Sequence, residues 1–228
     1  MTRTNLKHLW RAHIRPVLVL LIILTSMRSA IADWNTVPTG SMKPSIVEGD
    51  RIFVNKLAYG LKVPYTTWHL LRWDNPDRGE IVVFFSPKDG TRLVKRIVGL
   101  PGDEVQMINE QLIINGSRAS YQPLAGFANQ IASSDDARHE YAAEIINGAS
   151  HPVMATPSIR ALRNYGPVTV PPGHYLVLGD NRDNSADSRF IGMIPASSIV
   201  GRSSFVVLSL DYEDYYLPRR DRWFKKLP

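Results

Sequence analysis

Cysteine is absent from this sequence of 228 residues. Its absence excludes a disulfide scaffold, a thiolate metal site, a cysteine nucleophile and thiol redox chemistry. The G-x-S-x-G, H-E-x-x-H, P-loop and G-x-G-x-x-G patterns are also missing, and the six histidines show no metal-ligand spacing. The sequence therefore gives no indication of a metal or nucleotide cofactor, and no pattern in it supports a Ser-His-Asp site.

Excess positive charge is confined to the N-terminal segment. The chain has a net charge of +6, and residues 1–32 contain basic side chains but no acidic one. The basic residues there are Arg3, Lys7, Arg11, Arg15 and Arg28. The rest of the chain is nearly neutral, which argues against an extended surface for binding DNA or RNA.

One aliphatic run follows the basic residues, and no second run of spanning length comes after it. Residues 16–24 read PVLVLLIIL, and Ala30-Ile31-Ala32 lies just beyond. This arrangement is typical of a cleavable secretory signal. Residues 14–32 also approach the length of about 20 residues that crosses a bilayer, and Arg28 near the outer end can extend to the interface. Either interpretation keeps the basic end in the cytoplasm and exports the chain after about residue 33.

The hydrophobic pattern predicts a mostly β body. Short runs of β-branched and aromatic residues are bounded by Gly, Pro, Asn and Asp, as expected of strands. The runs cover Arg51–Val54, Glu80–Phe85, Thr91–Val98, Glu104–Ile108, Gln111–Ile114, Tyr175–Leu178 and Ile199–Leu210. Asn109-Glu110 separates two of them as a hairpin turn does. Because no long amphipathic helix is indicated after residue 33, we predict an antiparallel sheet or a barrel-like core.

Two stretches of the body lack this strand pattern. Residues 120–168 are rich in Ala, Ser, Asn and Asp, and we interpret them as an inserted subdomain that ends before Pro171-Pro172-Gly173. The tail, residues 218–226, mixes basic and aromatic side chains. We expect a solvated terminus there, with contact to an anionic membrane surface as the alternative.

A serine and a lysine are the candidate catalytic residues. Ser41 follows a glycine and precedes a nearby proline, so a sharp, exposed turn is expected to present it as a nucleophile. Lys95 lies deepest of all the lysines in a strand pattern, on the same face as Leu93 and Ile97. Burial among apolar neighbours lowers the pKa of a lysine and lets it act as a base. Taken alone, Ser41 also fits an ordinary turn, and Lys95 fits an edge-strand lysine that blocks aggregation.

A polar segment from Gly179 to Arg189 follows the strand predicted at Tyr175–Leu178. The spacing of its acidic residues does not match a calcium-binding loop. A loop that hydrogen-bonds to itself fits better, with its Asp and Arg residues paired and its serines free to orient a neighbouring group.

Four blocks of the sequence together resemble the bacterial type I signal (leader) peptidases, a family of membrane-anchored Ser-Lys proteases. The blocks occur in that family's order and cover Pro38–Ser45, Arg78–Pro87, Val94–Asp103 and Gly179–Arg189. The resemblance extends over about residues 28–210, and it leaves residues 120–168 unmatched in detail.

The resemblance implies catalytic roles for three matched residues. Ser41 would be the nucleophile and Lys95 its general base. Thr39 matches a position where the family has a hydroxyl residue that donates to the oxyanion, and the backbone N–H of Ser41 would be the second donor. No cofactor and no metal are implied.

Five further residues would support this site. Ser185 would hydrogen-bond to Lys95 and fix its amine. Asp187 and Arg189 would form an ion pair behind it. Asp180 and Arg96 also match positions in the family's motifs, and we interpret both as scaffold.

The resemblance also implies a location and a substrate. Residues 1–13 would be a cytoplasmic segment, 14–32 an uncleaved transmembrane anchor, and 33–228 a catalytic domain outside the bacterial inner membrane. Many relatives have two spans, whereas one is indicated here. The enzyme would be a monomer that cleaves signal-peptide-bearing preproteins after small-x-small sites such as Ala-x-Ala.

Two alternatives stay open at this point. One is a specialised Ser-Lys protease, such as an enzyme that matures a conjugation pilin. A self-cleaving protein like the SOS repressors belongs to the same alternative but fits poorly, because no DNA-binding domain is indicated before the serine. The other is a non-catalytic β-domain, tethered to the membrane, that binds exported peptides.

Overall fold

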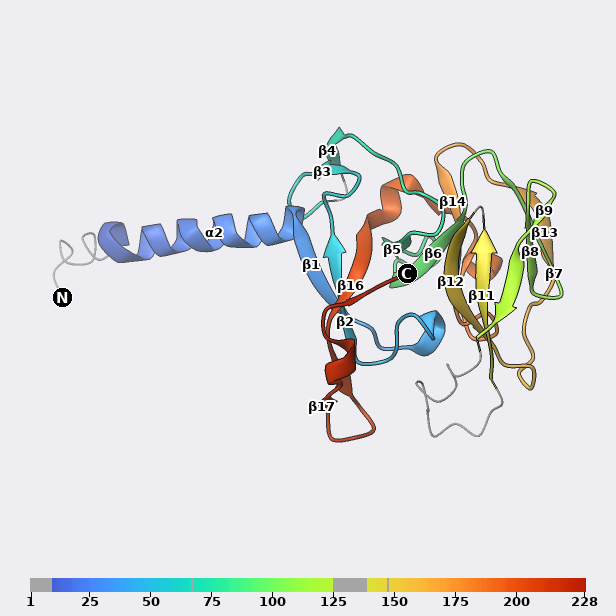
Figure 1. The fold of residues 1–228 in the computed structure, drawn as a ribbon. Coiled ribbons are helices and arrows are strands. Elements are labelled where there is room, and N and C mark those ends of the chain that lie inside the picture. Colours follow the sequence, from blue (N-terminus) through green and yellow to red (C-terminus); the bar gives the residue numbers. More distant parts are fainter. Residues whose placement is uncertain (1–9, 67, 125–138, 147) are drawn as a thin grey trace.

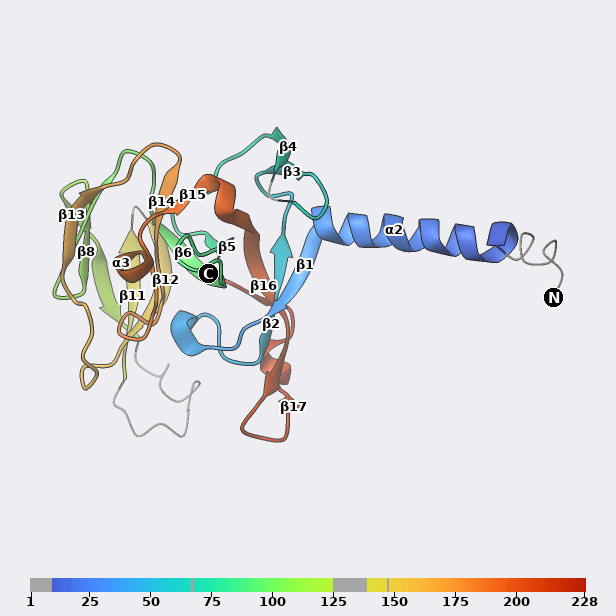
Figure 2. The same cartoon turned by 180° about the vertical axis from the view of Figure 1, so that it is seen from behind.

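The N-terminal part of the molecule is a helix that stands away from a β body (Figures 1 and 2). In this computed structural model the described residues are 10–66, 68–124, 139–146 and 148–228. A short π-helical turn, η1 (Trp10–Ile14), leads into α2 (Arg15–Ala30). The aliphatic side chains of residues 17–24 all lie exposed on α2, because none of the described parts of the β body packs around them.

The predicted span at 14–32 differs from the observed helix in its length. α2 has 16 residues, and Ala32 already belongs to the next strand, β1 (Ala32–Thr36), where it pairs with Asn55. Within the described residues, no helix combines the length and the apolar character that a bilayer crossing requires.

A curled antiparallel sheet forms the main body, which confirms the mostly β prediction. Its strands follow the order β1-β2-β16-β5-β6-β14-β15, and β17 and β18 pair with β16. Their bounds are β2 (Asp50–Asn55), β5 (Ile81–Phe85), β6 (Arg92–Gly99), β14 (His174–Leu178), β15 (Ile194–Pro195), β16 (Ile199–Asp211), β17 (Leu217–Pro218) and β18 (Lys225–Lys226). The predicted strand runs in this region all lie within or within one residue of these elements. A small hairpin of β3 (Gly60–Lys62) and β4 (His69–Arg72) projects beside the end of α2.

Both faces of the main sheet are buried around β5. Ile81 and Val83 belong to one apolar cluster, and Val82 and Phe84 belong to another, as the alternation of a strand requires. In β6, Leu93 packs against the second cluster, of which Ile97 is a member, whereas Val94 packs against the first. The next strand, β6, therefore runs through the core rather than along an edge.

A second β region lies beside the main sheet. β13 (Tyr165–Thr169), β7 (Glu104–Ile108), β8 (Gln111–Ile114) and β9 (Ser117–Arg118) form a four-stranded sheet, and β10 (Ser120–Pro123), β11 (Glu140–Ile146) and β12 (Ala149–Ala155) form a three-stranded one. The predicted turn at Asn109-Glu110 is confirmed, and both residues have positive φ, as a tight hairpin turn requires.

Strand content is higher than predicted between residues 120 and 168. β10, β11 and β12 fall in this stretch and β13 begins in it, while residues 125–138 and 147 lie outside the described residues. Polar residues masked the strand pattern, because Glu144 and His151 occupy buried strand positions instead of solvent-facing ones. Burial of these groups is possible because Glu144 is paired with Arg182.

The expectation of a solvated tail holds for most of residues 218–226, which are exposed, but the tail is also anchored to the body. Leu227 is buried in the apolar cluster that includes Val206, and β18 pairs with β16. Arg222 is buried as well, and its guanidinium forms an ion pair of 2.6 Å with Asp50. This pair brings the basic tail back onto the body.

Candidate active site

Ser41 lies in a short 3₁₀ turn, η2 (Gly40–Met42), that follows the extended residue Thr39. The next residues pin this turn to the core, because the side chains of Met42 and Ile46 are fully buried. The N–H of Ile46 also donates to the carbonyl oxygen of Met42 at 2.9 Å. The apolar side chains that anchor the turn leave Ser41 half-buried, at the surface of the core.

Lys95 is brought to Ser41 from the middle of β6. Its Nζ lies 2.6 Å from the Ser41 Oγ and donates to the carbonyl oxygen of Val94 at 2.9 Å. The Lys95 residue is only 2% exposed, and it pairs across the sheet with Val82 of β5, which is fully buried. The two residues that the sequence singled out therefore meet, although 54 positions separate them.

Burial lowers the pKa of Lys95 to about 8, although the carboxylates of Asp187 and Asp180 act in the opposite direction. Desolvation disfavours the ammonium form more than these carboxylates favour it. With a pKa near 8, a useful fraction of the amine is neutral at physiological pH, and its lone pair can accept the proton of a nearby hydroxyl.

A buried ion pair connects the lysine strand to the serine turn. Arg96 holds the carboxylate of Asp180 with two hydrogen bonds, from Nε at 2.8 Å and from Nη2 at 2.7 Å. Ser45, on the far side of the turn, donates to the same carboxylate at 2.5 Å. Because Arg96 follows Lys95 directly, this contact fixes β6 and η2 relative to each other. The prediction that Asp180 and Arg96 are scaffold agrees with this geometry.

Asp187 and Arg189 form the predicted ion pair, with 2.8 Å between Arg189 Nη2 and the carboxylate. Asp187 also caps α3 (Ser188–Ile191) and accepts a hydrogen bond of 3.0 Å from the N–H of Gly179. Both side chains are buried. The pair thus holds the start of the polar loop against its end.

Ser185 does not make the hydrogen bond to Lys95 that the resemblance implied. Its Oγ is buried and has no partner within the described residues. The side chain packs instead against Gly179, where a Cβ would lie 2.2 Å from the Ser185 Oγ and 2.5 Å from the Ser41 carbonyl oxygen. Ser185 is therefore next to the serine turn, but the Lys95 amine directs its bonds to Ser41 and Val94.

Thr39 is exposed beside Ser41, and its side chain makes no capping hydrogen bond to η2. Its predicted contact with an oxyanion stays a prediction. No group of three His, Asp or Glu side chains in the described ranges is arranged to hold a metal ion.

Asn181 is a site residue that the sequence analysis missed. Its backbone N–H donates to the Ser41 carbonyl oxygen at 3.2 Å, and its side-chain Nδ2 donates to the Gly40 carbonyl oxygen at 3.1 Å. Asn181 therefore holds the serine turn from the side of the polar loop. Within a segment already crowded with polar residues, no sequence signal separates this asparagine from its neighbours.

Arg182 was also missed, and it links the same loop to the second β region. It is buried and forms a double hydrogen bond with the carboxylate of Glu144 in β11, at 2.6 and 2.5 Å. Burial alone would raise the pKa of Glu144, but Arg182 and the neighbouring His151 together hold it well below its ordinary value. The carboxylate is thus a fixed negative charge that anchors Arg182.

Comparison with known proteins identifies the family. The sequence profile described as "Signal peptidase, peptidase S26" matches residues 10–208, which is most of the chain. The chain belongs to the signal peptidase family, peptidase S26. The resemblance stated from the sequence is therefore confirmed, and the protein is a serine endopeptidase of the signal peptidase I type.

Relatives of this signal peptidase cover most of its length. Signal peptidase I of Pseudomonas fluorescens is 35% identical over 206 residues, which span 85% of this chain and 70% of that protein. Signal peptidase I of Rickettsia typhi is 33% identical over 210 residues, which span 83% of this chain and 76% of that protein. The crystal structure of a signal peptidase I from Enterococcus faecalis V583 is 32% identical, with a TM-score of 0.36, and covers 57% of this chain and 97% of that one.

Substitution of Gly179 tests how closely the polar loop packs on the serine turn. We expect Gly179→Ala to lower kcat/KM on a signal-peptide substrate by about a hundredfold, because the new Cβ would displace Ser185 and the Ser41 backbone. Gly90→Ala is the matched control. Its Cβ has nothing within 4 Å, so a strained φ should cost about 1 kcal/mol of stability and leave kcat/KM unchanged. Equal activity of the two variants would contradict the packing argument.

Proposed function

We propose that this signal peptidase removes signal peptides from exported preproteins with Ser41 as nucleophile and Lys95 as general base. The observation that carries the proposal is the 2.6 Å contact between the Ser41 Oγ and the amine of a lysine that is 2% exposed. A protonated lysine on the surface cannot accept a proton, whereas a buried one with a lowered pKa can.

The reaction follows from this contact. Neutral Lys95 takes the hydroxyl proton of Ser41 as its oxygen attacks the scissile carbonyl carbon. The oxyanion accepts hydrogen bonds from the Thr39 hydroxyl and the Ser41 N–H. The tetrahedral intermediate collapses when Lys95 gives its proton to the leaving amine, and the mature protein departs. A water molecule, deprotonated by Lys95, then hydrolyses the acyl-enzyme and releases the signal peptide.

The surrounding residues act as positioning groups in this proposal. The Arg96–Asp180 pair fixes the strand of Lys95 to the turn of Ser41, and the Asp187–Arg189 pair stabilises the loop beside them. Ser185 lies near the turn, and its hydroxyl has no partner among the described residues, so a small shift on substrate binding would allow it to contact the Lys95 amine.

We further propose that the substrate's Ala-x-Ala segment binds as an extended strand beside the site, since small pockets accept alanine and exclude larger side chains. Dedicated processing of one exported protein, such as a conjugation pilin, would use the same chemistry and differ only in substrate. A non-catalytic peptide-binding role is disfavoured by the serine–lysine contact, which a binding domain does not need.

Residues 14–32 are proposed as the membrane anchor of a monomeric enzyme, with residues 1–13 in the cytoplasm and 33–228 outside the inner membrane. The basic residues before α2 and the aliphatic side chains along it support this orientation. The end of α2 is attached to the body, since Tyr65 donates hydrogen bonds to Thr25 and Ser29 at 2.7 and 2.8 Å. Residues 120–168 are proposed as an inserted subdomain of the exported part.

Replacement of Lys95 by arginine tests whether Lys95 acts as a proton acceptor or only contributes a positive charge. We expect Lys95→Arg and Ser41→Ala each to lower kcat by about four orders of magnitude or more, because arginine does not lose its proton and alanine has no nucleophile. The measurement is single-turnover cleavage of a preprotein by the full chain in detergent. Lys88→Arg, on an exposed lysine, is the control and should cleave normally. Processing at the normal rate by Lys95→Arg would eliminate the lysine base.

The pH dependence of kcat/KM reports the same group. Because burial lowers the pKa of Lys95 to about 8, the amine is protonated and inactive below that value and neutral above it. We therefore expect kcat/KM to rise about tenfold per pH unit up to roughly pH 8 and then to level off. A midpoint above pH 10, where an exposed lysine titrates, would contradict burial of the catalytic amine.

The N-terminus of the protein isolated from membranes tests the anchor. We expect the sequence of the isolated protein to include residues 14–32, because an uncut segment keeps the site close to membrane-bound substrates. Edman sequencing or mass spectrometry of the intact chain makes this measurement. A chain that begins at Asp33 would show that Ala30-Ile31-Ala32 is cleaved and that residues 14–32 are not the anchor.

A further inference from the structure

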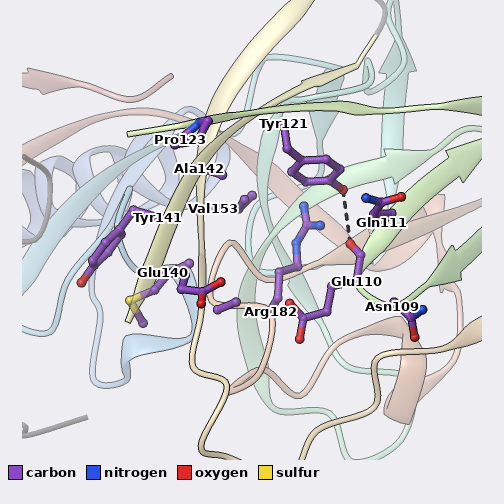
Figure 3. Close-up of a pocket in the computed structure, with 12 residues that line it drawn as sticks. Asn109, Glu110, Gln111, Tyr121, Pro123, Glu140, Tyr141, Ala142, Val153 and Arg182 are labelled. Atoms are coloured by element: carbon purple, nitrogen blue, oxygen red, sulfur yellow. Dashed lines mark hydrogen bonds between the residues drawn. The ribbon is translucent and has the colours of Figure 1, made fainter. Parts of the chain in front are cut away.

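A cavity of about 460 Å³ lies in the second β region, outside the catalytic residues (Figure 3). It opens between the three-stranded sheet of β10, β11 and β12 and the turn that joins β7 to β8. Its apolar wall includes Tyr121, Val153 and Met154, and its charged residues are Glu110, Glu140 and Arg182. A volume of this size accommodates a short stretch of peptide.

The floor of the cavity is held by the same segment that holds the nucleophile. Met154 donates its N–H to the Asp180 carbonyl oxygen at 2.8 Å, and Arg182 donates its own N–H to the Met154 carbonyl oxygen at 2.8 Å. Between these two residues, Asn181 donates to the Ser41 carbonyl oxygen. Residues 180–182 thus lie between the serine turn on one side and the cavity on the other.

Arg182, which lines the cavity, has one side-chain donor without an acceptor among the described residues. Arg182 is 3% exposed, and both of its Nη groups are bonded to Glu144. Its Nε has no hydrogen-bond partner within the described residues, and Figure 3 shows the guanidinium directed toward Tyr121. A buried N–H without an acceptor is unfavourable, and a carbonyl oxygen of a bound peptide would satisfy it.

The charge around the cavity favours a cation. Glu144 already neutralises Arg182. Among the described residues, Glu110 and Asp183 both pair with Arg163, and Glu140 adds a further carboxylate to the wall. Burial and the nearby Asp183 carboxylate raise the pKa of Glu110, although Arg163 acts in the opposite direction. A lysine or arginine side chain in the cavity would lie close to the carboxylates of Glu110 and Glu140 and would favour their charged forms.

The Tyr121 ring gives this cation an apolar surface for its aliphatic stem. The Tyr121 hydroxyl accepts from the Leu112 N–H at 3.0 Å and donates to Glu144 at 2.5 Å, so its position is fixed. The cavity therefore combines a preformed apolar wall, a guanidinium N–H of Arg182 without an acceptor among the described residues, and the carboxylates of Glu110 and Glu140, a set that matches an extended peptide with one basic residue.

We propose that this cavity is a subsite for the mature part of the preprotein, beyond the bond that Ser41 cleaves, and that it selects an extended segment carrying a lysine or arginine. The inference rests on the proposed function, because the polypeptide that reaches the neighbouring serine turn is the preprotein. After acylation, the signal peptide stays on Ser41, and the cavity holds the leaving side of the chain.

The test uses pairs of substrates that share one Ala-x-Ala segment. Long peptides continue for ten residues after the cleavage site and carry one lysine or one glutamate, scanned from the third position onward, while a short peptide ends after two residues. With the full chain at low salt, we expect KM for the best lysine peptide to be about threefold below that of its glutamate partner.

Two variants test whether the lower KM of the lysine peptides depends on the cavity. Glu140→Gln should reduce the lysine preference, and Ala142→Phe, which fills the cavity from β11, should raise the ratio of long-peptide to short-peptide KM. Glu104→Gln removes an exposed carboxylate of β7 outside the cavity and should change neither quantity.

Each outcome decides one proposal. The subsite is refuted if the unmodified enzyme shows no preference for lysine peptides, or if the preference is unchanged in Glu140→Gln and Ala142→Phe. Cleavage of the short peptide would still support the proposed peptidase activity in either case. If no peptide is cleaved, the proposed function fails, and calorimetric titration of the ten-residue leaving peptide into the Ser41→Ala chain still decides the subsite. The subsite is supported if the peptide binds to the Ser41→Ala chain and binds more weakly when Ala142→Phe is added. It is refuted if the peptide does not bind, or if it binds equally to the chains with and without Ala142→Phe.

Discussion

The short contact between the Lys95 amine and the Ser41 hydroxyl is the constraint on which the rest of this structure depends. It requires two opposed conditions, because a lysine must be desolvated to lose its proton and must still meet a polar partner. Placement of Lys95 in the middle of β6 meets the first condition, since strands on both sides cover it. The serine turn meets the second, since its apolar anchors keep Ser41 at the surface of the core.

Buried ion pairs maintain this arrangement. Arg96–Asp180 joins the lysine strand to the serine turn, and Asp187–Arg189 closes the polar loop. Arg222 pairs with Asp50 at the start of β2 and donates to the Ser45 carbonyl oxygen, which brings the tail against the body beside the serine turn. Such pairs add little net stability compared with apolar packing, but removal of one partner leaves a buried charge and is strongly destabilising. Their common effect here is positional: Arg96–Asp180 and Arg222–Asp50 join segments that lie far apart in the sequence, whereas Asp187–Arg189 fixes the local shape of the polar loop.

The second β region is attached to the polar loop of residues 179–189 through charge as well as through backbone hydrogen bonds. Glu144 and Arg182 neutralise each other in the interior, and Met154 pairs with residues 180–182 next to the serine turn. Movement of this region would therefore strain the loop that supports Ser41. The arrangement gives residues 120–168, for which no sequence pattern indicated a role, a direct structural connection to the site.

The sequence by itself determined the β class and the positions of the main strands, because strand alternation is a local property of the chain. The pairing of one serine with one lysine was predicted from the resemblance of four ordered blocks to a known family. Tertiary structure alone decided the features that depend on burial of polar groups. Glu144, Arg222 and Asn181 read as solvent-facing residues in the sequence, and each is buried against a partner that is distant along the chain. Ser185 shows that a motif can also imply a contact that the structure does not make. Its hydroxyl lies close to the serine turn but does not form the hydrogen bond to Lys95 that the family motif implied. A motif specifies which residues are present, whereas sheet register and packing decide which of their atoms come into contact.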